Sequence, residues 1–498
     1  IAILSEARPE WGVAFFASIH SGAITVPLDI KLTQSELASI LSDAKPKILC
    51  VSGEFVEAAR LLKSTIPSIE QVIVIEEGVQ SEFSTYDKLR SKQVMPGVQQ
   101  AIDDTALIIY TSGTTGNPKG VMISFKNIIF QVQRFESIMN LSPNDLFLSM
   151  LPLNHLLELT CGFMGVLHAG GKICYCKSLH PQEIAKTMTE KKVTLMITVP
   201  LFLKMLKGSI DKQIRKQSAF KQRLFKLMLQ LARAIPVYSL KKVMFGQIHQ
   251  QFGDRLRGFI SGGAPLDVEV GEFFETIGIP VYQGYGLSET SPVVTVNTPD
   301  QNRLGSVGVP LKGVEVCIAR EGKGNGEGEI LTRGPHVMQG YYGREDLTRE
   351  VIDQDGWFHT GDLGKIDKDG FLFITGRIKN LIVLGGGKKI HPEEVEAALS
   401  NTPLIKEICV LSKVQKDGLK EGTEEVCAVI VPSDDLKRKM NNQGVEIEKE
   451  IKRETDRLNQ NLAQYKRPTR IFLRLDDFPK TATRKIKRLL VNEWLKNQ

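Results

Sequence analysis

Short apolar runs alternate with amphipathic stretches over the first part of the chain. Residues 10–22 and 33–44 repeat their apolar positions at the spacing of an amphipathic helix. Other runs are brief and bounded by polar residues, as buried strands are, and they span 23–29, 46–52, 70–77, 107–113, 145–153, 171–176 and 193–200. This alternation predicts βα units around parallel sheet, and therefore an α/β fold.

The pattern changes beyond about residue 305, where glycines punctuate the apolar runs. Strands are predicted at 313–319, 326–334, 370–377, 406–413, 424–432 and 469–476. Helical patterns at 391–401 and 446–462 lie between the later strands. We expect a large N-terminal domain over 1–378 that ends in a small β unit, followed by a small α+β domain over 379–498.

Residues 204–242 stand apart because they are rich in Lys and Arg and contain Asp211 as their only acid. Leu, Phe and Met are interleaved with these charges, and 219–235 has the pattern of a basic amphipathic helix. Such a helix either packs on its own domain or lies on a membrane surface. The sequence leaves both interpretations open.

Composition narrows the class of protein. A chain of 498 residues with 42% hydrophobic and 24% charged residues is ordinary for a globular protein of several structural units. No apolar run is long enough to predict a spanning helix. The net charge of +7 suits anionic substrates such as nucleotides and does not by itself indicate nucleic acid binding. Ile1 opens the chain inside an apolar run, so we expect further sequence upstream.

The seven cysteines are scattered and odd in number, which is typical of reduced, mostly buried thiols in a cytoplasmic protein. Only Cys174 and Cys176 lie close together, with His168 and His180 nearby. Alternation within a strand accounts for the spacing of the two cysteines, and a metal site is the alternative.

The stretch YTSGTTGNPKGV, residues 110–121, combines hydroxyls, glycines and one lysine directly after a strand-like run. It lacks the Gly-x-x-x-x-Gly-Lys-Ser/Thr spacing of the common phosphate loop. Its glycines let backbone amides face an anion, while its hydroxyls donate and its lysine adds positive charge. These features predict a phosphate-binding loop formed by Thr111, Ser112, Gly113, Thr114, Thr115, Gly116 and Lys119.

Further motifs follow this loop in order. They are SGGAPL at 261–266, QGYGLSET at 283–290, GWFHTGDLG at 356–364, GRIKNLIVLGGGKKIHPEEVE at 376–396 and PKTATRKIKR at 479–488. The series resembles the adenylate-forming, AMP-binding superfamily of acyl-CoA synthetases, luciferases and peptide synthetase adenylation domains, over nearly the whole chain. The resemblance implies that a carboxylate attacks the α-phosphate of ATP to give an acyl-adenylate and pyrophosphate. A thiol then takes the acyl group and AMP leaves.

The resemblance also implies roles for individual residues. Glu289 is matched to the carboxylate that carries Mg²⁺ on the ATP phosphates, assisted by the Thr111 hydroxyl, and oxygen ligands suit that ion. Thr290 is matched to the α-phosphate or the substrate carboxylate. Lys485 is matched to the catalytic lysine of adenylation, although many members carry glycine just before it and this chain has Arg484. A solvated surface position is the alternative for Glu289 and for Lys485.

Adenine needs a flat apolar slot, and ribose needs groups that bind its hydroxyls. Tyr285 offers an aromatic face opposite the narrow backbone of 262–265, unless it is an ordinary core tyrosine. By resemblance, Asp362 and Arg377 contact the ribose. The predicted nucleotide contacts outside the phosphate loop are Gly263, Ala264, Pro265, Tyr285, Gly286, Asp362 and Arg377.

The family rotates its small C-terminal domain between the two half-reactions, and Lys379 occupies the hinge position. The resemblance places a glycine turn beside the pantetheine arm of CoA in the second step. This turn is Gly385, Gly386 and Gly387, for which an ordinary turn is the alternative.

The nature of the acid is suggested by 151–171, where Leu, Phe and Met surround His155. His155 lies at the family's gate-side position near the carboxylate, with structural packing as the alternative. Residues 284–297 look most like the long-chain fatty acid–CoA ligases. We therefore predict a cytoplasmic, Mg²⁺-dependent ligase that uses ATP, CoA and a long-chain fatty acid, and that touches a membrane if 204–242 lies on one. The rivals are an acyl–acyl-carrier-protein ligase, a ligase for another acid, and a non-catalytic nucleotide-binding relative.

Overall fold

The computed structural model describes residues 1–90, 95–111, 118–176, 178, 180–319, 326–384, 388–414, 424–443, 446–480 and 486–498. The backbone packs as two compact units. The larger unit comprises Ile1–Val316, Thr332–His359 and Lys368–Leu372, and the smaller unit Cys317–Leu331, Thr360–Asp367 and Phe373–Gln498. The two units are each discontinuous in sequence and therefore do not test a single domain boundary. The predicted boundary between residues 378 and 379 stays a prediction.

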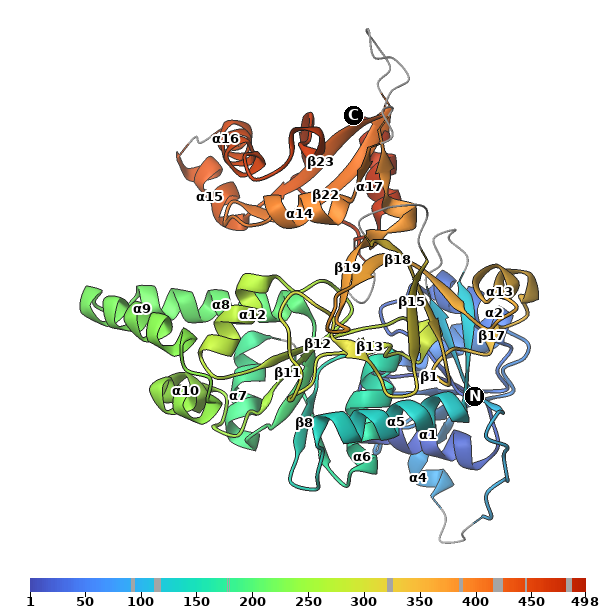
Figure 1. The fold of residues 1–498 in the computed structure, drawn as a ribbon. Helices are drawn as coiled ribbons and strands as arrows, with labels where there is room; N and C mark the ends of the chain where they lie inside the picture. The colour runs from blue at the N-terminus through green and yellow to red at the C-terminus, as the bar shows by residue number, and fades with distance from the viewer. Residues whose placement is uncertain are drawn as a thin grey trace. The chain divides into compact units, whose positions relative to one another are not determined.

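A five-stranded parallel sheet in the order β2-β1-β3-β4-β5 forms the N-terminal part of the larger unit (Figure 1). Helix α2 begins at a capping box, in which the Thr33 hydroxyl accepts from the Glu36 amide and the Glu36 carboxylate accepts from the Thr33 amide. The strands are β1 (Ala2–Leu4), β2 (Val26–Pro27), β3 (Ile48–Val51), β4 (Gln71–Val74) and β5 (Ser84–Thr85). The helices are α1 (Pro9–His20), α2 (Gln34–Ala44), η1 (Gly53–Phe55), α3 (Val56–Thr65) and α4 (Tyr86–Leu89). The predicted βα units are confirmed here.

A seven-stranded sheet in the order β14-β13-β12-β11-β10-β8-β9 is the centre of the larger unit. Its five strands from β12 to β9 run parallel, and β13 and β14 add an antiparallel edge. Its strands are β8 (Leu146–Ser149), β9 (Lys172–Tyr175), β10 (Leu195–Thr198), β11 (Gly258–Ser261), β12 (Val281–Tyr285), β13 (Thr295–Val296) and β14 (Val309–Pro310). Cys174 lies in β9, in agreement with the strand interpretation of the paired cysteines.

Helices cover both faces of this sheet because its side chains alternate in direction. Met196 and Phe259 enter a core with α7, α8, α11 and α12, whereas Ile197 and Ile260 enter another with α5 and η2. The helices of this region are α5 (Phe125–Met139), the π-helix η2 (Leu157–Gly165), α6 (Val166–His168), α7 (Pro181–Lys191), α8 (Pro200–Arg215), α9 (Ala219–Arg233), α10 (Tyr238–Met244), α11 (Gly246–Gln251) and α12 (Val268–Thr276).

The apolar run at 107–113 departs from the predicted parallel pattern. It forms β6 (Thr105–Thr111), which pairs antiparallel with β7 (Lys119–Ser124), and β17 (Gly340–Tyr341) adds the third strand. A strand that returns after a short connection can pair only antiparallel, since a parallel return needs a long crossover. The large unit also contains η3 (Ser288–Thr290) and α13 (Glu345–Val351).

The smaller unit is α+β, as predicted. A hairpin of β22 (Ile405–Val414) and β23 (Glu424–Pro432) pairs parallel with β24 (Arg470–Leu473). Helices α14 and α16 bury their apolar faces on one side of this sheet and α17 on the other. Most residues of a further sheet, in the order β15-β16-β18-β19, also belong to this unit, and its strands are β15 (Glu315–Ala319), β16 (Gly328–Arg333), β18 (Phe358–Ile366) and β19 (Leu372–Arg377). The unit also contains the hairpin of β20 (Ile382–Val383) and β21 (Lys389–Ile390). The helices are η4 (Ile378–Asn380), α14 (Pro392–Leu399), α15 (Asp434–Gln443), α16 (Ile447–Asn459), η5 (Gln464–Lys466) and α17 (Arg488–Lys496).

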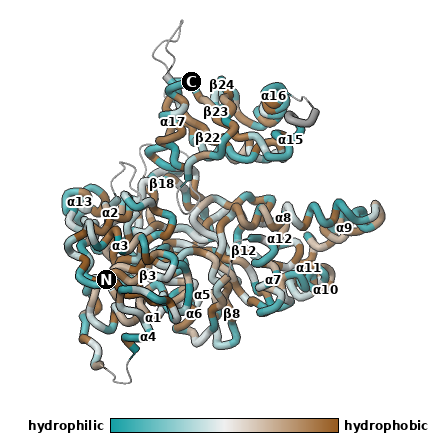
Figure 2. The backbone as a smooth tube through the Cα atoms, turned by 180° about the vertical axis from the view of Figure 1, so that it is seen from behind, coloured by the Kyte–Doolittle hydropathy of each residue, from teal (hydrophilic) through white to brown (hydrophobic). Residues whose placement is uncertain are grey.

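The apolar residues concentrate inside the layers of each unit, as the brown segments of Figure 2 show. All seven cysteines are free thiols, and four of them are buried. In the described residues, no helix combines the length and the apolar character that crossing a bilayer requires.

Candidate active site

Several of the residues predicted for the site lie along one edge of the seven-stranded sheet. Strands β10, β11 and β12 are parallel neighbours, and their carboxyl ends are Thr198, Ser261 and Tyr285. The register pairs Thr198 with Ser261 and Ser261 with Gln283, so the loops that follow these strands leave from the same edge. This carboxyl edge is where open α/β sheets bind ligands.

The first of the predicted nucleotide contacts outside the phosphate loop follow directly after β11. Residues Gly263, Ala264 and Pro265 form an exposed turn between β11 and α12. Tyr285 ends the neighbouring strand and is half-buried, with part of its ring packed on a cluster that includes Val294. The turn and the tyrosine therefore stand at the ends of adjacent strands, as the adenine slot requires, although the packing of the tyrosine also fits the core alternative.

Glu289 lies in η3, a few residues beyond Tyr285, and the hydroxyl of Tyr341 donates a 2.9 Å hydrogen bond to its Oε1. The ring of Tyr341 in turn lies under Lys119, whose Nζ is 5.1 Å from the ring centroid. Burial, followed by the nearby Glu289 carboxylate, raises the pKa of Tyr341, so the phenol stays protonated and keeps donating. Three distant segments thus bring a carboxylate, a phenol and an ammonium group together.

This trio adjoins the predicted phosphate loop. Thr111 ends β6 and Lys119 begins β7, and the two residues are paired across the antiparallel ladder. Tyr341 pairs with Val121 on the other side of β7. The predicted contacts Ser112, Gly113, Thr114, Thr115 and Gly116 lie outside the described residues. Both ends of the loop therefore lie in the three-stranded sheet that also carries Tyr341, the hydrogen-bond partner of Glu289.

Thr290 is fully buried and its hydroxyl is occupied by the backbone. It accepts from the Leu287 amide at 2.8 Å and lies 2.9 Å from the Pro292 carbonyl, to which it donates. The same carbonyl approaches Gly286 so closely that a Cβ there would lie 1.7 Å from it. The structure thus gives Thr290 and Gly286 a part in shaping the Glu289 turn, and their predicted contact with ATP stays a prediction.

Gln131 of α5 anchors the backbone of this turn by hydrogen bonds. Its side-chain amide donates to the Thr290 carbonyl at 3.1 Å and to the Val293 carbonyl at 2.7 Å. The Glu289 carbonyl also accepts from the Met338 amide at 2.9 Å. The backbone that carries Glu289 is therefore fixed by two other segments, which limits the motion of the carboxylate.

The predicted ribose pair lies in the smaller unit. Arg377 at the end of β19 contacts Asp362 in β18, with Nε 2.5 Å from Oδ1 and Nη2 3.4 Å from Oδ2. Asp362 is buried, and its amide donates to the Thr360 hydroxyl at 3.1 Å. The structure brings together two residues that the sequence separates, in a two-pronged ion pair. Their contact with ribose stays a prediction.

Lys485 lies outside the described residues, but both ends of the segment that carries it are anchored. Lys480 and Ile486 form a β-bridge, and the Lys487 amide donates to the Pro479 carbonyl at 2.8 Å. Lys480 is ion-paired with Glu407. Beyond the segment, Arg488 binds Glu396 with 2.6 Å contacts to both carboxylate oxygens.

The remaining predictions for the smaller unit fall on its connecting segments. Lys379 is exposed in η4, directly after β19, and the neighbouring Asn380 donates to Glu393 at 2.7 Å. The predicted CoA-side residues Gly385, Gly386 and Gly387 lie outside the described residues. Both predictions stay predictions.

His155 precedes the π-helix η2 and is half-buried, with its carbonyl accepting from the Leu159 amide at 3.0 Å. The π-helix is rare and is frequently found at functional sites. Inside it lies Glu158, which is 1% exposed. Its Oε2 makes no hydrogen bond with any described residue. A Cβ at position 162 would lie 2.9 Å from the Glu158 carboxyl carbon, so glycine is needed there to admit this side chain.

Burial raises the pKa of Glu158 to about 8, from an ordinary value of 4.5. Within the described residues, the side chains that interact electrostatically with it are Ser149, Cys161 and Tyr175, and none of them carries a positive charge. The side chain is therefore protonated in the folded protein at neutral pH. Residue Glu158 was not predicted from the sequence, where a glutamate in an apolar stretch carries no sign of its burial.

Glu158→Gln is expected to change how stability depends on pH. Between pH 4.5 and about 8, folded Glu158 holds a proton that the unfolded chain has lost, so its contribution to stability falls as pH rises. The slope is at most about 1.4 kcal/mol per pH unit. Glutamine keeps the shape and cannot titrate, so the variant should gain stability relative to the parent from pH 5 to pH 8. Denaturant unfolding of both proteins measures this gap, and a gap independent of pH would contradict the prediction.

Comparison with known proteins settles the family. Residues 1–342 match the family model described as AMP-binding enzyme, and residues 394–485 match that of the AMP-binding enzyme C-terminal domain. The chain belongs to the AMP-binding enzyme family. Glu289 and Tyr341 lie within the first match, and Lys485 is the last residue of the second.

Individual members of the AMP-binding enzyme family give the degree of similarity. A long-chain-fatty-acid–CoA ligase of Mycobacterium bovis is 30% identical over 437 residues, which cover 82% of this chain and 70% of that ligase. A chloroplastic long-chain-fatty-acid–[acyl-carrier-protein] ligase of Arabidopsis thaliana is 32% identical over 386 residues, 66% of this chain and 51% of its own length.

Solved structures of AMP-binding enzymes extend the likeness to the fold. ATP-bound MatB from Rhodopseudomonas palustris has a TM-score of 0.78 at 26% identity and covers 99% of this chain and 88% of its own. The o-succinylbenzoate coenzyme A synthetase of Bacillus subtilis, in complex with ATP and magnesium ion, has a TM-score of 0.74 at 26% identity, with 99% and 88% covered. Adenylate-forming enzymes of this kind have a large N-terminal and a smaller C-terminal domain, which confirms the predicted fold class.

Two further groups escaped the sequence analysis. Tyr341 comes from a short GYYG stretch with no motif of its own, 52 residues beyond Glu289. Glu396 and Arg488 are 92 residues apart, and each looks in the sequence like one charge among many on a polar helix or tail. Periodicity and local motifs carry no information about such long-range partners, so no signal in the sequence would have found them.

Proposed function

We propose that this AMP-binding enzyme is a long-chain fatty acid–CoA ligase. It joins a fatty acid to AMP with loss of pyrophosphate and then transfers the acyl group to CoA with release of AMP. The observation that carries the proposal is the grouping of Glu289 and Tyr341 with Lys119, which is paired with Thr111 where the two ends of the predicted phosphate loop meet. The long-chain specificity is supported by the names of relatives at about 30% identity.

The first half-reaction joins two anions, so its main requirement is charge neutralisation and alignment. A carboxylate oxygen attacks the α-phosphorus of ATP, and the bond from that phosphorus to the bridging oxygen of the β-phosphate breaks. Lys119 and the loop it ends hold the β- and γ-phosphates, which leave together. Lys485 neutralises the carboxylate and the α-phosphate as they meet. The phosphate loop therefore acts as a clamp on the leaving group.

The oxygen groups of Glu289 and Thr111 fit Mg²⁺, which prefers carboxylate and hydroxyl oxygens. Tyr341 donates to Oε1 of Glu289, and within the described residues no hydrogen bond or ion pair engages its second oxygen. The carboxylate is therefore oriented and still has an oxygen to offer. When bound with ATP, the metal supplies positive charge on the phosphates. Tyr341 acts as the positioning residue that fixes the Glu289 rotamer.

In the second half-reaction the CoA sulfur attacks the acyl carbonyl, the thioester bond forms, and the bond from the carbonyl carbon to the phosphate oxygen of AMP breaks. Asp362 and Arg377 keep the ribose in place during both steps. Lys379 is the proposed hinge for the rearrangement between the steps, and Gly385, Gly386 and Gly387 form the proposed path of the pantetheine arm.

The acyl chain is proposed to lie next to the η2 segment. Leu153, Leu156, Leu159, Phe163 and Met164 belong to one apolar cluster around His155 and Glu158. A protonated Glu158 places no charge beside an acyl tail, whereas an ionised one would. The apolar surroundings favour a fatty acid over an amino acid, whose ammonium group would need a counter-ion.

ATP–pyrophosphate exchange over a panel of carboxylic acids tests this proposal. We expect exchange to rise from octanoate to palmitate and to be weak with benzoate and with amino acids. Adding CoA should yield acyl-CoA and AMP in equal amounts. Exchange that peaks with an aryl or amino acid would overturn the long-chain assignment, and exchange with none of the acids would overturn the enzyme assignment.

The acyl carrier protein is the second candidate acceptor, because one relative of the chain is a ligase for that carrier. CoA and carrier protein supplied separately with the preferred fatty acid distinguish the two. A higher kcat/KM with carrier protein would reassign the acceptor and leave the adenylation step unchanged.

A further inference from the structure

The helices from α8 to α10 form the most apolar exposed surface of the chain. Ten of the 27 exposed large apolar side chains in the described residues lie between Leu201 and Val243. Figures 1 and 2 place α9 and α10 together at one end of the larger unit. Exposed apolar side chains scattered singly need no explanation, but a concentration of them indicates a binding surface.

Helix α9 has two apolar faces. The inner face is Phe225, Met228, Leu229 and Ala232, which pack on the core of the larger unit. The outer face is Phe220, Leu224, Leu227 and Leu231, at spacings of four, three and four residues that align them on one side of the helix. These four are 75%, 44%, 50% and 55% exposed. The helix therefore satisfies its own fold with one face and leaves the other uncovered.

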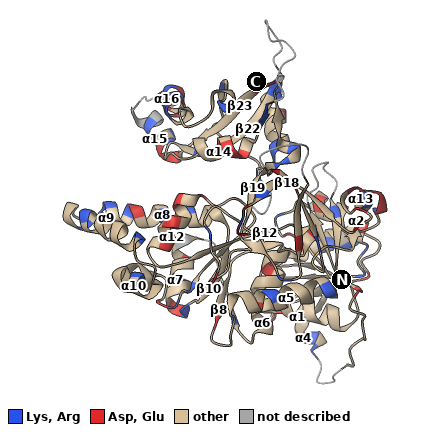
Figure 3. Ribbon diagram, viewed as in Figure 1, with Lys and Arg blue, Asp and Glu red and all other residues tan. Residues whose placement is uncertain are grey.

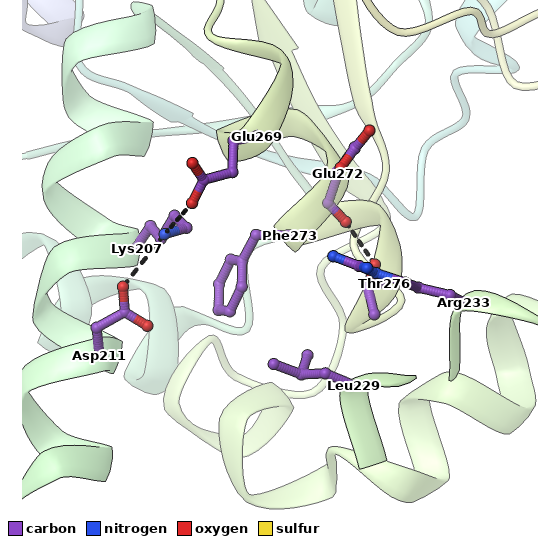
Figure 4. A pocket seen from close by; sticks show the side chains of 8 residues that line it. All are labelled: Lys207, Asp211, Leu229, Arg233, Glu269, Glu272, Phe273 and Thr276. Carbon is purple, nitrogen blue, oxygen red and sulfur yellow. Dashed lines mark hydrogen bonds and ion pairs between the residues drawn. The ribbon is translucent and has the colours of Figure 1, made fainter. Parts of the chain in front are cut away.

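The inner face is firmly seated. The Phe225 ring meets that of Phe245 edge-on, with centroids 5.9 Å apart. Figure 4 shows a shallow pocket along this seam, where Leu229 of α9 faces Phe273 of α12. At its rim Lys207 of α8 lies 3.2 Å from Asp211 and 3.1 Å from Glu269. The ion pairs join α8 to itself and to α12, whereas the apolar contacts of the inner face seat α9 on the core and leave its outer face uncovered.

The charges of the segment that carries the outer apolar face are almost all positive. Residues 204–242 contain eleven Lys and Arg against the single acid Asp211. In Figure 3 the ribbons of α8 and α9 carry blue segments at their Lys and Arg positions. Eight of them are exposed: Lys204, Lys212, Arg215, Lys216, Lys221, Arg223, Lys226 and Arg233.

We propose that α9 and its neighbour α10 lie on the surface of an anionic lipid bilayer. An exposed leucine and phenylalanine stripe flanked by lysine and arginine is the chemistry of an interfacial helix, in which the apolar side enters the acyl boundary and the basic side chains reach lipid phosphates. Leu240 and Val243 of α10 are 55% and 80% exposed and extend the apolar area. An acidic protein would match the charge but would leave this apolar stripe poorly matched.

Binding to vesicles tests this surface. Co-sedimentation with phosphatidylcholine vesicles that contain phosphatidylglycerol should recover the protein, with much less recovered on pure phosphatidylcholine or at high salt. The triple variant Leu224→Gln, Leu227→Gln, Leu231→Gln should weaken partition by about tenfold or more. Removing the charge of Lys221 or Lys226 should weaken it by about fivefold each.

A matched control removes equally exposed leucines elsewhere. Leu61→Gln, Leu89→Gln, Leu475→Gln replaces side chains that are 57%, 53% and 58% exposed and lie outside 204–242. This control should bind vesicles like the parent. All variants should keep the parent's pyrophosphate exchange with soluble octanoate, which separates loss of the membrane surface from loss of the proposed enzymatic function.

Other occupants of the face give different results, and each would overturn the proposal. Equal binding to neutral and anionic vesicles would exclude charge recognition, and equal binding by the α9 triple variant and its control would exclude this face. If the α9 variant converts a parental dimer to a monomer in sedimentation velocity and still binds vesicles, a second copy covers the face. If the α9 triple variant no longer binds acyl carrier protein but still binds vesicles, an acidic protein covers the face.

Discussion

Glu289→Gln is expected to lower acyl-adenylate formation by at least about 100-fold, the usual loss when a preorganised electrostatic group is removed from a reacting centre. Glutamine keeps the shape and can still accept from Tyr341, so the turn of η3 should fold as before. The change removes the negative charge that would hold Mg²⁺ against the ATP phosphates. Pyrophosphate exchange measured as a function of Mg²⁺ concentration checks the prediction, and excess metal should restore little activity.

Tyr341→Phe is the matched control, because it removes the 2.9 Å hydrogen bond to Glu289 and leaves both the carboxylate and the ring beneath Lys119. A positioning role predicts a smaller loss, about tenfold, that added Mg²⁺ partly reverses. If Glu289→Gln exchanged pyrophosphate like the parent at limiting Mg²⁺, Glu289 would not be the metal carboxylate.

Lys485→Ala is expected to lower the first half-reaction by about 1000-fold, because no other group is assigned to neutralise the carboxylate and the α-phosphate as they meet. The second half-reaction does not need that charge. Acyl-adenylate supplied ready-made should therefore still react with CoA at near the parental rate. Pyrophosphate exchange and thioester formation from synthetic acyl-adenylate measure the two steps separately.

Lys487→Ala is the control for loss of charge in the same basic segment. It removes one ammonium group two residues away, at a half-buried position whose backbone amide bonds to Pro479 and whose side chain has no assigned role. Its pyrophosphate exchange rate should stay within about threefold of the parent, because substitutions of residues with no structural or catalytic role usually have small effects. Equal losses in Lys485→Ala and Lys487→Ala would mean that overall positive charge, and not one lysine, supports adenylation.

Local pattern in the sequence was enough for most of the elements. Parallel βα units, the small α+β unit and the basic helix, predicted over 219–235 and observed over Ala219–Arg233, follow from apolar periodicity, because each element must bury one face or stripe. The run at 107–113 was the exception. Its apolar residues are those of any buried strand, and its antiparallel pairing is decided by the short return to β7.

Motif order in the sequence also determined the family and the candidates Glu289, Asp362, Arg377 and Lys485, since glycine turns and charged residues at set positions are local features. Only the tertiary structure decided which side chains interact with one another and which are buried. The Tyr341 hydrogen bond to Glu289 and the ion pair of Arg488 with Glu396 each join segments that are far apart in the sequence. The burial of Glu158 depends on which residues cover its side chain.

The sequence of α9 also predicts an amphipathic helix, but it contains two apolar stripes and does not show which of them is buried. Only packing shows that Phe225 and Leu229 are covered while Leu224 and Leu227 are not, because burial is a property of the neighbours and not of the residue.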